Sequence, residues 1–179
     1  MRALHATTVS GIDQLPEPSK SALAFLDAWA ESRHGKLVPR KRDFDPLRLP
    51  ALLPHIWLSR YHEAEDLFRV RLSGEKVNEA WGYSIAGKTS LEIMGPADNA
   101  VMMKIWHGVL DVPQIHYGTQ ERLSGNVLYA AERIAAPLAE DDGRRVYILG
   151  FSLYALGGTP DYAPPNLIEN AYNIPCREL

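Results

Sequence analysis

The segment Leu67-Phe68-Arg69-Val70-Arg71-Leu72-Ser73-Gly74 determines the fold prediction for this chain. Apolar and basic residues alternate along it, and a period of two is the pattern of a β-strand with one buried face. A second strand is predicted just upstream, over residues 56–61, because the intervening polar segment His62-Glu63-Ala64-Glu65-Asp66 suits a hairpin loop. The two strands together predict a β-hairpin.

The chain downstream of this hairpin has the pattern of short helices. Residues 77–81 predict a helix of one or two turns that stops at Gly82, and a second helix begins at Thr89 or Ser90. A longer amphipathic helix is expected over about residues 97–110, and its apolar face should belong to the core. That face consists of Val101, Met102, Ile105, Trp106 and Val109.

The last third of the chain has β character. Three strands are expected, over residues 115–123, 128–138 and 146–154. Asp141-Asp142-Gly143 separates the last two strands, and an Asp-Gly pair between apolar runs favours a tight hairpin turn because both central residues can take positive φ. Ser124-Gly125-Asn126 is the expected turn between the first two. The order is therefore two strands, a helical stretch and a three-stranded meander.

An amphipathic helix precedes the first strand. It is expected over residues 21–34, with a stop at Gly35. Its apolar positions recur at helical spacing and are Ala22, Phe25, Leu26 and Trp29. A helix placed ahead of a domain either folds back on the core or pairs with a second copy of the chain, and the sequence leaves both arrangements open.

These elements divide the chain into three parts. Residues 1–20, with two prolines near their end, are expected to form an N-terminal arm. Residues 21–155 form a single α+β domain that includes the N-terminal helix. Residues 156–179 are expected to be an irregular C-terminal tail, because the stretch 157–165 is rich in glycine and proline.

Composition and charge exclude several classes of protein. The 179 residues are 46% hydrophobic and 23% charged, as expected for one globular domain. The formal net charge is -3, and the richest basic stretch, Arg40-Lys41-Arg42, is followed at once by Asp43 and Asp45. Such a sequence does not predict a nucleic-acid partner.

Cysteine usage and hydropathy bear on the compartment. The single cysteine, Cys176, excludes an internal disulfide and a cysteine-based zinc site, and it suits a reducing compartment. No stretch approaches the roughly 18 apolar residues of a membrane span, and the N-terminus lacks the apolar core of a secretion signal. We therefore expect a cytoplasmic protein without a membrane partner.

A series of short motifs connects the chain with a known family. In order, the motifs are Trp29 with Gly35, Pro39-Arg40, Asp43-Phe44-Asp45-Pro46, Leu52-Leu53-Pro54, Phe68-Arg69-Val70-Arg71-Leu72-Ser73-Gly74, Gly87-Lys88, Glu132-Arg133 and Pro137-Leu138. Each is common alone, and the specificity lies in the ordered series. Over residues 22–152 the chain resembles the bacterial PAS_5 family of the PAS superfamily. The resemblance implies a PAS-like fold, a five-stranded antiparallel sheet with flanking short helices, that serves signalling, with a small ligand and self-association.

A PAS-like fold implies a pocket between the curved sheet and the helical stretch. The candidates to line it are Trp81, Tyr83, Met102, Trp106, His107, His116 and Tyr129. We favour Trp81 and Trp106, because each lies on a helix that should face the sheet. Ligand pockets are themselves mostly apolar, so the pattern alone does not separate pocket residues from ordinary core.

The sequence does not identify a cofactor. His107 or His116 could ligate haem iron, but no Cys-x-x-Cys-His motif supports haem attachment. A flavin of the photoreceptor kind would need a reactive cysteine inside the domain, and Cys176 lies in the tail. The polar residues 62–66 lack a metal-ligand spacing and are explained by a hairpin loop.

Two arginines on one strand have two interpretations. Arg69 and Arg71 lie two residues apart and could hold a carboxylate ligand between them. They could equally pair with Glu132 on a neighbouring strand, and we favour this cross-strand ion pair.

The predicted function is a sensory or signalling module that binds a small molecule, a partner protein or both. We expect no enzymatic activity and no output domain, since only some 25 residues follow the last strand, and we expect a homodimer formed through the helix at 21–34. Two alternatives stay open. One is a small α+β enzyme with a general acid or base in the same cavity, and the other is a structural adaptor whose core is filled by its own aromatic residues.

Overall fold

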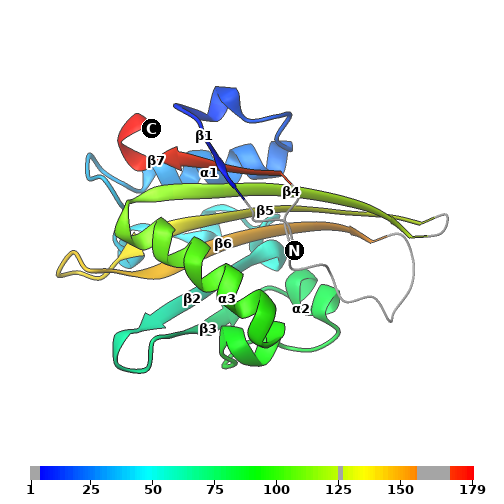
Figure 1. Cartoon of the computed structure of the whole chain (residues 1–179). Coiled ribbons are helices and arrows are strands. Elements are labelled where there is room, and N and C mark those ends of the chain that lie inside the picture. Colours follow the sequence, from blue (N-terminus) through cyan, green and yellow to red (C-terminus); the bar gives the residue numbers. More distant parts are fainter. Residues whose placement is uncertain (1–4, 125–126, 157–169) are drawn as a thin grey trace.

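A single seven-stranded sheet forms the centre of the molecule (Figure 1). The computed structural model describes residues 5–124, 127–156 and 170–179, and describes side chains for 5–120, 130–155 and 170–179. The strand order is β1-β7-β4-β5-β6-β2-β3, with every neighbouring pair antiparallel except β1 and β7. The strands are β1 Thr7–Thr8, β2 Ile56–His62, β3 Leu67–Ser73, β4 Gln114–Ser124, β5 Val127–Ala139, β6 Arg145–Leu156 and β7 Asn170–Pro175.

The α+β class is confirmed, but the prediction of five strands is wrong. The five predicted strands are present as β4-β5-β6-β2-β3. Two further strands, β7 and then β1, extend the sheet from the free edge of β4, and they come from the segments predicted to be tail and arm. β1 has only two residues and β7 contains two asparagines and a proline, so neither has an alternating apolar pattern.

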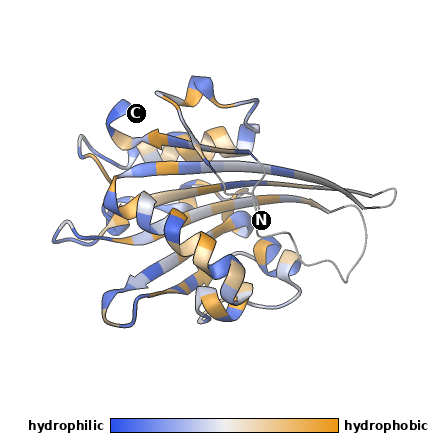
Figure 2. Ribbon diagram, in the orientation of Figure 1, coloured by the Kyte–Doolittle hydropathy of each residue, from blue (hydrophilic) through white to orange (hydrophobic). Residues whose placement is uncertain are grey.

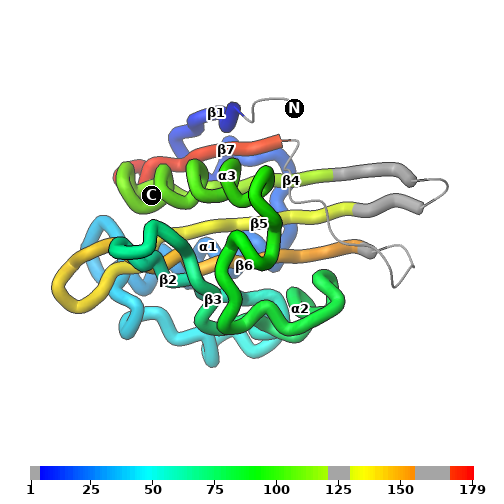
Figure 3. Tube along the Cα trace, turned by 60° about the horizontal axis from the view of Figure 1, so that its bottom comes forward, coloured from blue at the N-terminus to red at the C-terminus, as the bar shows by residue number. Residues whose placement is uncertain are grey.

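Helices cover both faces of the sheet. α1, Lys20–Glu31, lies on one face, and α2, Glu75–Trp81, and α3, Ser90–Asp111, lie on the other (Figures 1 and 3). Figure 2 shows that hydrophilic and hydrophobic residues are mixed along these helices. The remaining helical turns are short 3-10 segments: η1 Ile12–Gln14, η2 Lys41–Asp43, η3 Pro46–Arg48, η4 Leu53–His55, η5 Glu63–Glu65 and η6 Cys176–Glu178. In the described part of the chain, no helix is both long and apolar enough to cross a membrane.

α1 folds back on its own sheet. The Ser19 hydroxyl caps it by accepting a hydrogen bond from the Ala22 N–H at 3.0 Å. The four apolar positions predicted from the sequence are all fully buried, and the Trp29 indole donates to the Pro137 carbonyl at 3.0 Å. The apolar face that we assigned to a homodimer is therefore occupied by the chain itself. A dimer through that face would require α1 to leave the sheet.

The carboxylate of Glu132 anchors the start of α1. Its Oε1 accepts hydrogen bonds from the Ser19 backbone N–H and from the Tyr117 hydroxyl, each at 2.9 Å. The predicted ion pair between Glu132 and Arg69 or Arg71 is wrong. β2 and β6 separate β3 from β5, and Arg69 instead donates to the Gly87 carbonyl at 3.0 Å. Glu132 is thus a helix anchor.

The first hairpin contains a β-bulge that breaks the predicted alternation. The register changes between Leu58, which faces Leu72, and Ser59, which faces Val70. Arg71 is left without a cross-strand partner, and the pleat shifts by one residue there. Leu72 consequently lies on the α1 face and is 45% exposed, whereas Val70 is buried beneath the helices of the other face.

α3 consists of two helical pieces, as the sequence predicted. A capping box begins the first piece, because the Thr89 hydroxyl accepts from the Glu92 N–H and the Glu92 carboxylate accepts from the Thr89 N–H. The break is at Gly95, which has a positive φ of 76°, and Pro96 follows it. α3 as a whole contacts β3, β4, β5 and β6.

Candidate ligand cavity

A small, partly open cavity lies between the sheet and the helices α2 and α3. Its volume is about 60 Å³. Three tryptophans, two methionines and several aliphatic side chains form most of its wall. The full lining is Trp57, Val70, Val77, Trp81, Ile85, Ile93, Met94, Met102, Trp106, Arg133, Ser152 and Tyr154.

Trp57 on β2 fills much of the space that the sheet and helices enclose. Its ring lies directly over Gly150 on the neighbouring strand β6, so that a Cβ at position 150 would be only 1.8 Å from the Trp57 Cε2. The Trp57 indole N–H donates to the Ser152 hydroxyl at 3.0 Å, which fixes the orientation of the ring. Only glycine at position 150 leaves room for this ring.

Trp106 on α3 forms the helical side of the cavity. Its ring centroid is 5.4 Å from that of Trp57 and 5.0 Å from that of Phe68, against which it packs edge-on. Its indole Nε1 is buried and has no hydrogen-bond partner in the described part of the chain. A buried donor without a partner costs free energy, so an acceptor atom placed there would be favourable.

Few polar groups reach the cavity. Apart from Ser152 they are Arg133 and Tyr154, whose guanidinium carbon and ring centroid are 5.5 Å apart. An apolar wall with a small number of polar groups is the usual composition of a small-molecule site. The lining residues include no carboxylate, histidine or cysteine that could serve as a general base or a metal ligand.

The structure brings together three of the seven predicted pocket residues and places three others elsewhere. Trp81, Met102 and Trp106 line the cavity, in agreement with their positions on helices that face the sheet. Tyr83 follows the end of α2, is 42% exposed, and lies against the Lys88 ammonium at 5.6 Å. The Tyr129 side chain falls outside the described residues.

His116 is buried but lies away from the cavity. It lies on β4 and its Nδ1 is 2.8 Å from the Asn173 Oδ1 of β7, so it joins these two strands. Burial lowers the pKa of His116, because its ring is only 5% exposed and the charged form loses its hydration there. The ring is therefore a neutral cross-link at neutral pH.

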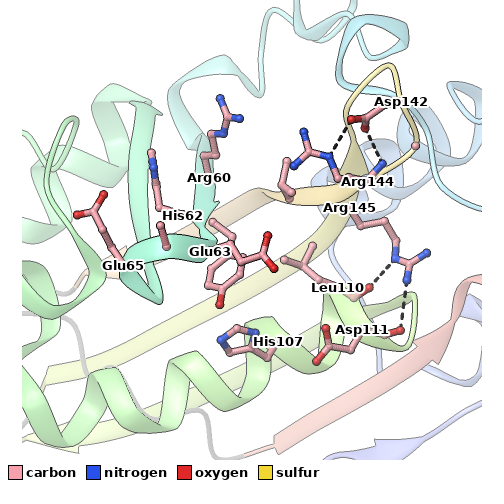
Figure 4. A pocket seen from close by; sticks show the side chains of 14 residues that line it. Arg60, His62, Glu63, Glu65, His107, Leu110, Asp111, Asp142, Arg144 and Arg145 are labelled. Carbon is pink, nitrogen blue, oxygen red and sulfur yellow. Dashed lines mark hydrogen bonds and ion pairs between the residues drawn. The ribbon is translucent and has the colours of Figure 1, made fainter.

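His107 lines a different feature, an open polar cleft of about 710 Å³ (Figure 4). The cleft lies where η5, the C-terminal end of α3 and the turn between β5 and β6 meet. Figure 4 shows Arg145 directed at the carbonyls of Leu110 and Asp111, and Arg144 bonded to Asp142. The Arg145 bonds join the start of β6 to the C-terminal end of α3, and the Arg144 bond lies within the turn between β5 and β6.

The histidine of the cleft belongs to a small polar cluster. The His107 Nε2 is 3.3 Å from an oxygen of Asp66, and the Tyr61 hydroxyl donates to the same oxygen at 2.8 Å. The hydrogen bond to Asp66 raises the pKa of Tyr61 to about 12. Among the described residues, no group of three or more histidine, cysteine, aspartate or glutamate side chains could hold a metal ion.

The cavity in this conformation does not fit haem or a flavin. Neither His107 nor His116 lines it. Its volume of about 60 Å³ is also well below the roughly 300–1,000 Å³ of sites for drug-sized ligands and cofactors.

Trp57 is the main cavity residue that the sequence pattern did not identify. It lies between Ile56 and Leu58, which are buried on the α1 face of the sheet. A run of three apolar residues in a strand buried on both faces carries no alternation, so it does not show which side chain faces the helices. The glycine opposite, Gly150, is the one signal of a close approach.

Comparison with known proteins gives one match. The family model PAS_5, described as a PAS domain, matches residues 18–153. The match covers the helix α1 and the five strands from β2 to β6 almost completely, and it includes every residue that lines the cavity except Tyr154. No curated protein matches the chain.

Proposed function

The chain belongs to the PAS_5 family of PAS domains, and from this membership we propose that it is a sensory module whose cavity beneath α3 binds a small, mostly apolar molecule. The observation that carries the proposal is an apolar cavity lined by Trp106, whose buried indole N–H has no partner in the described residues. A ligand with one hydrogen-bond acceptor would satisfy this donor.

The volume of the cavity limits the size of the ligand. An engineered apolar cavity of about 150 Å³ is known to bind benzene, so about 60 Å³ suits a molecule of only a few non-hydrogen atoms. A somewhat larger ligand would have to displace the Met94 and Met102 side chains. Methionine is unbranched and adapts readily, so these two residues form the yielding part of the wall.

The signal would leave the cavity through α3. Met94 immediately precedes the break at Gly95 and Pro96, and α3 as a whole contacts four strands of the sheet. A ligand that pushes Met94 or Trp106 would tilt one piece against the other at this break, where the backbone hydrogen bonds are already interrupted. We propose that this movement changes the contacts of the domain with a partner protein.

A structural adaptor is the second candidate function, and one observation favours it. Trp57 fills much of the space between the sheet and the helices. Its ring fits over Gly150 and is hydrogen-bonded to Ser152, as expected where a side chain of the protein occupies the space that a ligand would take. An enzyme is less well supported, because PAS domains are generally non-enzymatic and the described residues that line the cavity include no carboxylate, histidine or cysteine.

The test uses the indole N–H signals of the protein labelled with nitrogen-15. Titration with acetone, which carries an acceptor, should shift the Trp106 indole signal more than isobutene, a molecule of similar shape without that acceptor. Trp29 is an internal control, since its indole lies on the other face of the sheet and already donates to Pro137. Assignment of the four signals follows from Trp57→Phe, Trp81→Phe and Trp106→Phe, and the remaining signal is that of Trp29.

Two results would reject the ligand proposal. If neither probe moves the signals of Trp57, Trp81 or Trp106, the cavity is closed and the structural adaptor is the better description. If both probes move Trp29 as much as Trp106, the binding is non-specific.

A further inference from the structure

An apolar groove lies on the α1 face of the sheet, away from the cavity. Its volume is about 230 Å³, larger than that of the cavity. We propose that this groove docks an acidic amphipathic helix of a partner protein. The residues that line it are Lys41, Phe44, Pro46, Leu53, Ile56, Leu58, Leu72, Leu138 and Leu149, and we call this set the outer groove.

Prolines leave the outer groove open. α1 ends at Glu31, and the chain that returns from it to β2 contains Pro46, Pro50 and Pro54. Proline interrupts a continuous helix, so this segment forms separate 3-10 turns that cover the sheet only in part. The floor of the groove is consequently the leucines and isoleucine of the sheet itself.

Exposed apolar side chains border the opening. Leu72, turned to this face by the β-bulge, is 45% exposed, and Leu47, beside Pro46, is 73% exposed. Both are large apolar residues that a folded domain usually covers when they lie next to an apolar groove. An apolar side chain of a partner would gain burial at this site.

The charge at the rim is positive. The Lys41 ammonium and the Arg60 guanidinium lie 5.8 Å and 5.5 Å from the centre of the Tyr147 ring, and Arg71 directly precedes Leu72, which lines the groove. Arg60 is paired with Glu140 at 3.2 Å. Lys41 and Arg71 have no ion-pair partner within the described residues.

The carboxylates of the neighbouring segments are engaged elsewhere. Asp43 bonds to Lys36 at 3.0 Å, and Asp45 caps η3 by accepting from the Leu47 N–H. Asp141 pairs with Arg42 at 3.1 Å. Asp45 keeps its negative charge, because a backbone N–H does not neutralise it. The charges of Lys41 and Arg71 outnumber it, so the rim carries a positive charge that complements an acidic ligand.

The same features argue against other occupants. A second copy of the chain would bring the cations of two equivalent rims together in a symmetric contact. A strand added to the edge of β3 would compete with the chain itself, because Val70 already bonds to Gly87 and Lys88 at 2.8 and 2.9 Å. An amphipathic helix laid in the groove meets neither obstacle.

This inference rests on the proposed signalling role, but its test does not depend on a cavity ligand. The probe is a fluorescent peptide with leucines at helical positions i, i+3, i+4 and i+7 and glutamates elsewhere, compared with the same peptide carrying lysines. The acidic peptide should bind at least about tenfold more tightly, and its binding should weaken with salt. Leu72→Glu and Lys41→Glu should each weaken it by a similar factor, while Leu91→Glu, an equally exposed leucine on the opposite face, should leave binding unchanged.

Several outcomes would overturn the proposal. Equal binding of the two peptides, no binding of either, or an equal loss in Leu91→Glu would show that the outer groove does not select an acidic helix. A wild-type dimer that Leu72→Glu converts to a monomer would identify a second copy as the occupant. Binding to vesicles containing phosphatidylserine, without peptide binding, would identify a membrane surface. If the peptide does not bind but the ketone shifts the Trp106 indole signal, the proposal of a cavity ligand stands and only the docking proposal is rejected.

Discussion

Replacement of Gly150 by alanine should push the Trp57 ring out of its place. The new Cβ would be 1.8, 2.1 and 2.3 Å from three atoms of the ring. Ordinary carbon contacts are about 3.5–4.0 Å, so ring and strand must separate by roughly 1.7 Å. Trp106 stands on the other side of the ring at 5.4 Å and limits that movement. Overpacking of this kind typically lowers the free energy of unfolding by about 1–3 kcal/mol.

Urea denaturation of four variants measures this effect. Trp57→Ala alone should cost about 3–5 kcal/mol because it empties part of the core. In the double variant the alanine at position 150 has no indole ring beside it. Gly150→Ala should therefore add less than about 0.5 kcal/mol to the loss of stability caused by Trp57→Ala, and the coupling energy between the two substitutions should be about 1–3 kcal/mol. Gly108→Ala is the control, since its Cβ meets only the Gln114 side chain at 3.4 Å and alanine favours the helix. If the losses of stability in the two single variants add up in the double variant, or if Gly150→Ala is as stable as wild type, Trp57 does not pack against Gly150 as described.

Three further predictions concern the edges of the sheet and α1. Burial holds the pKa of His116 below its ordinary value of 6.5, so the unfolded chain binds the proton more tightly than the folded chain does. The free energy of unfolding should therefore be highest above pH 6.5 and fall as the pH drops below that value. His116→Gln should make the free energy of unfolding, measured with urea, less dependent on pH between about pH 8 and pH 5. Ser19→Ala should lower the free energy of unfolding by about 1 kcal/mol through loss of the α1 cap, whereas Ser21→Ala should change it by less than about 0.5 kcal/mol. Glu132→Gln should cost about 1 kcal/mol, since a neutral amide oxygen accepts the two hydrogen bonds from Ser19 and Tyr117 less strongly, and wild-type stability would contradict its role as an anchor.

The sequence predicted elements whose signal is local. The hairpin, the break before the long helix and the meander each follow from alternation, capping or glycine within a few residues. β7 was missed because its pairing with β4 is determined by tertiary contacts, including the bond of His116 to Asn173, and its own residues mix asparagine with proline. The strict alternation in β3 failed at Arg71, because a bulge depends on the partner strand.

The candidate site was predicted only in part, because some of its residues carry a local sequence signal and others do not. Trp81 and Trp106 lie on amphipathic helices whose apolar face is readable from the sequence. Which face a strand residue occupies depends on register, so neither Trp57 nor His116 could be placed from its own neighbours. Sequence therefore identified the helical wall of the cavity and not its floor.

The contacts between the two ends of the chain bear on how this protein is made. β1 pairs with β7 through Thr7 and Tyr172, and the Arg33 guanidinium bonds to the main-chain oxygens of Cys176 and Leu179. A ribosome adds about 5–20 residues per second, so roughly 8–33 s separate the synthesis of Thr7 from that of its partner. During that interval the apolar face of α1 has no completed sheet to cover it. The apolar face of α1 is thus exposed to aggregation during that interval, and the described sheet is complete only after β7 has been synthesised.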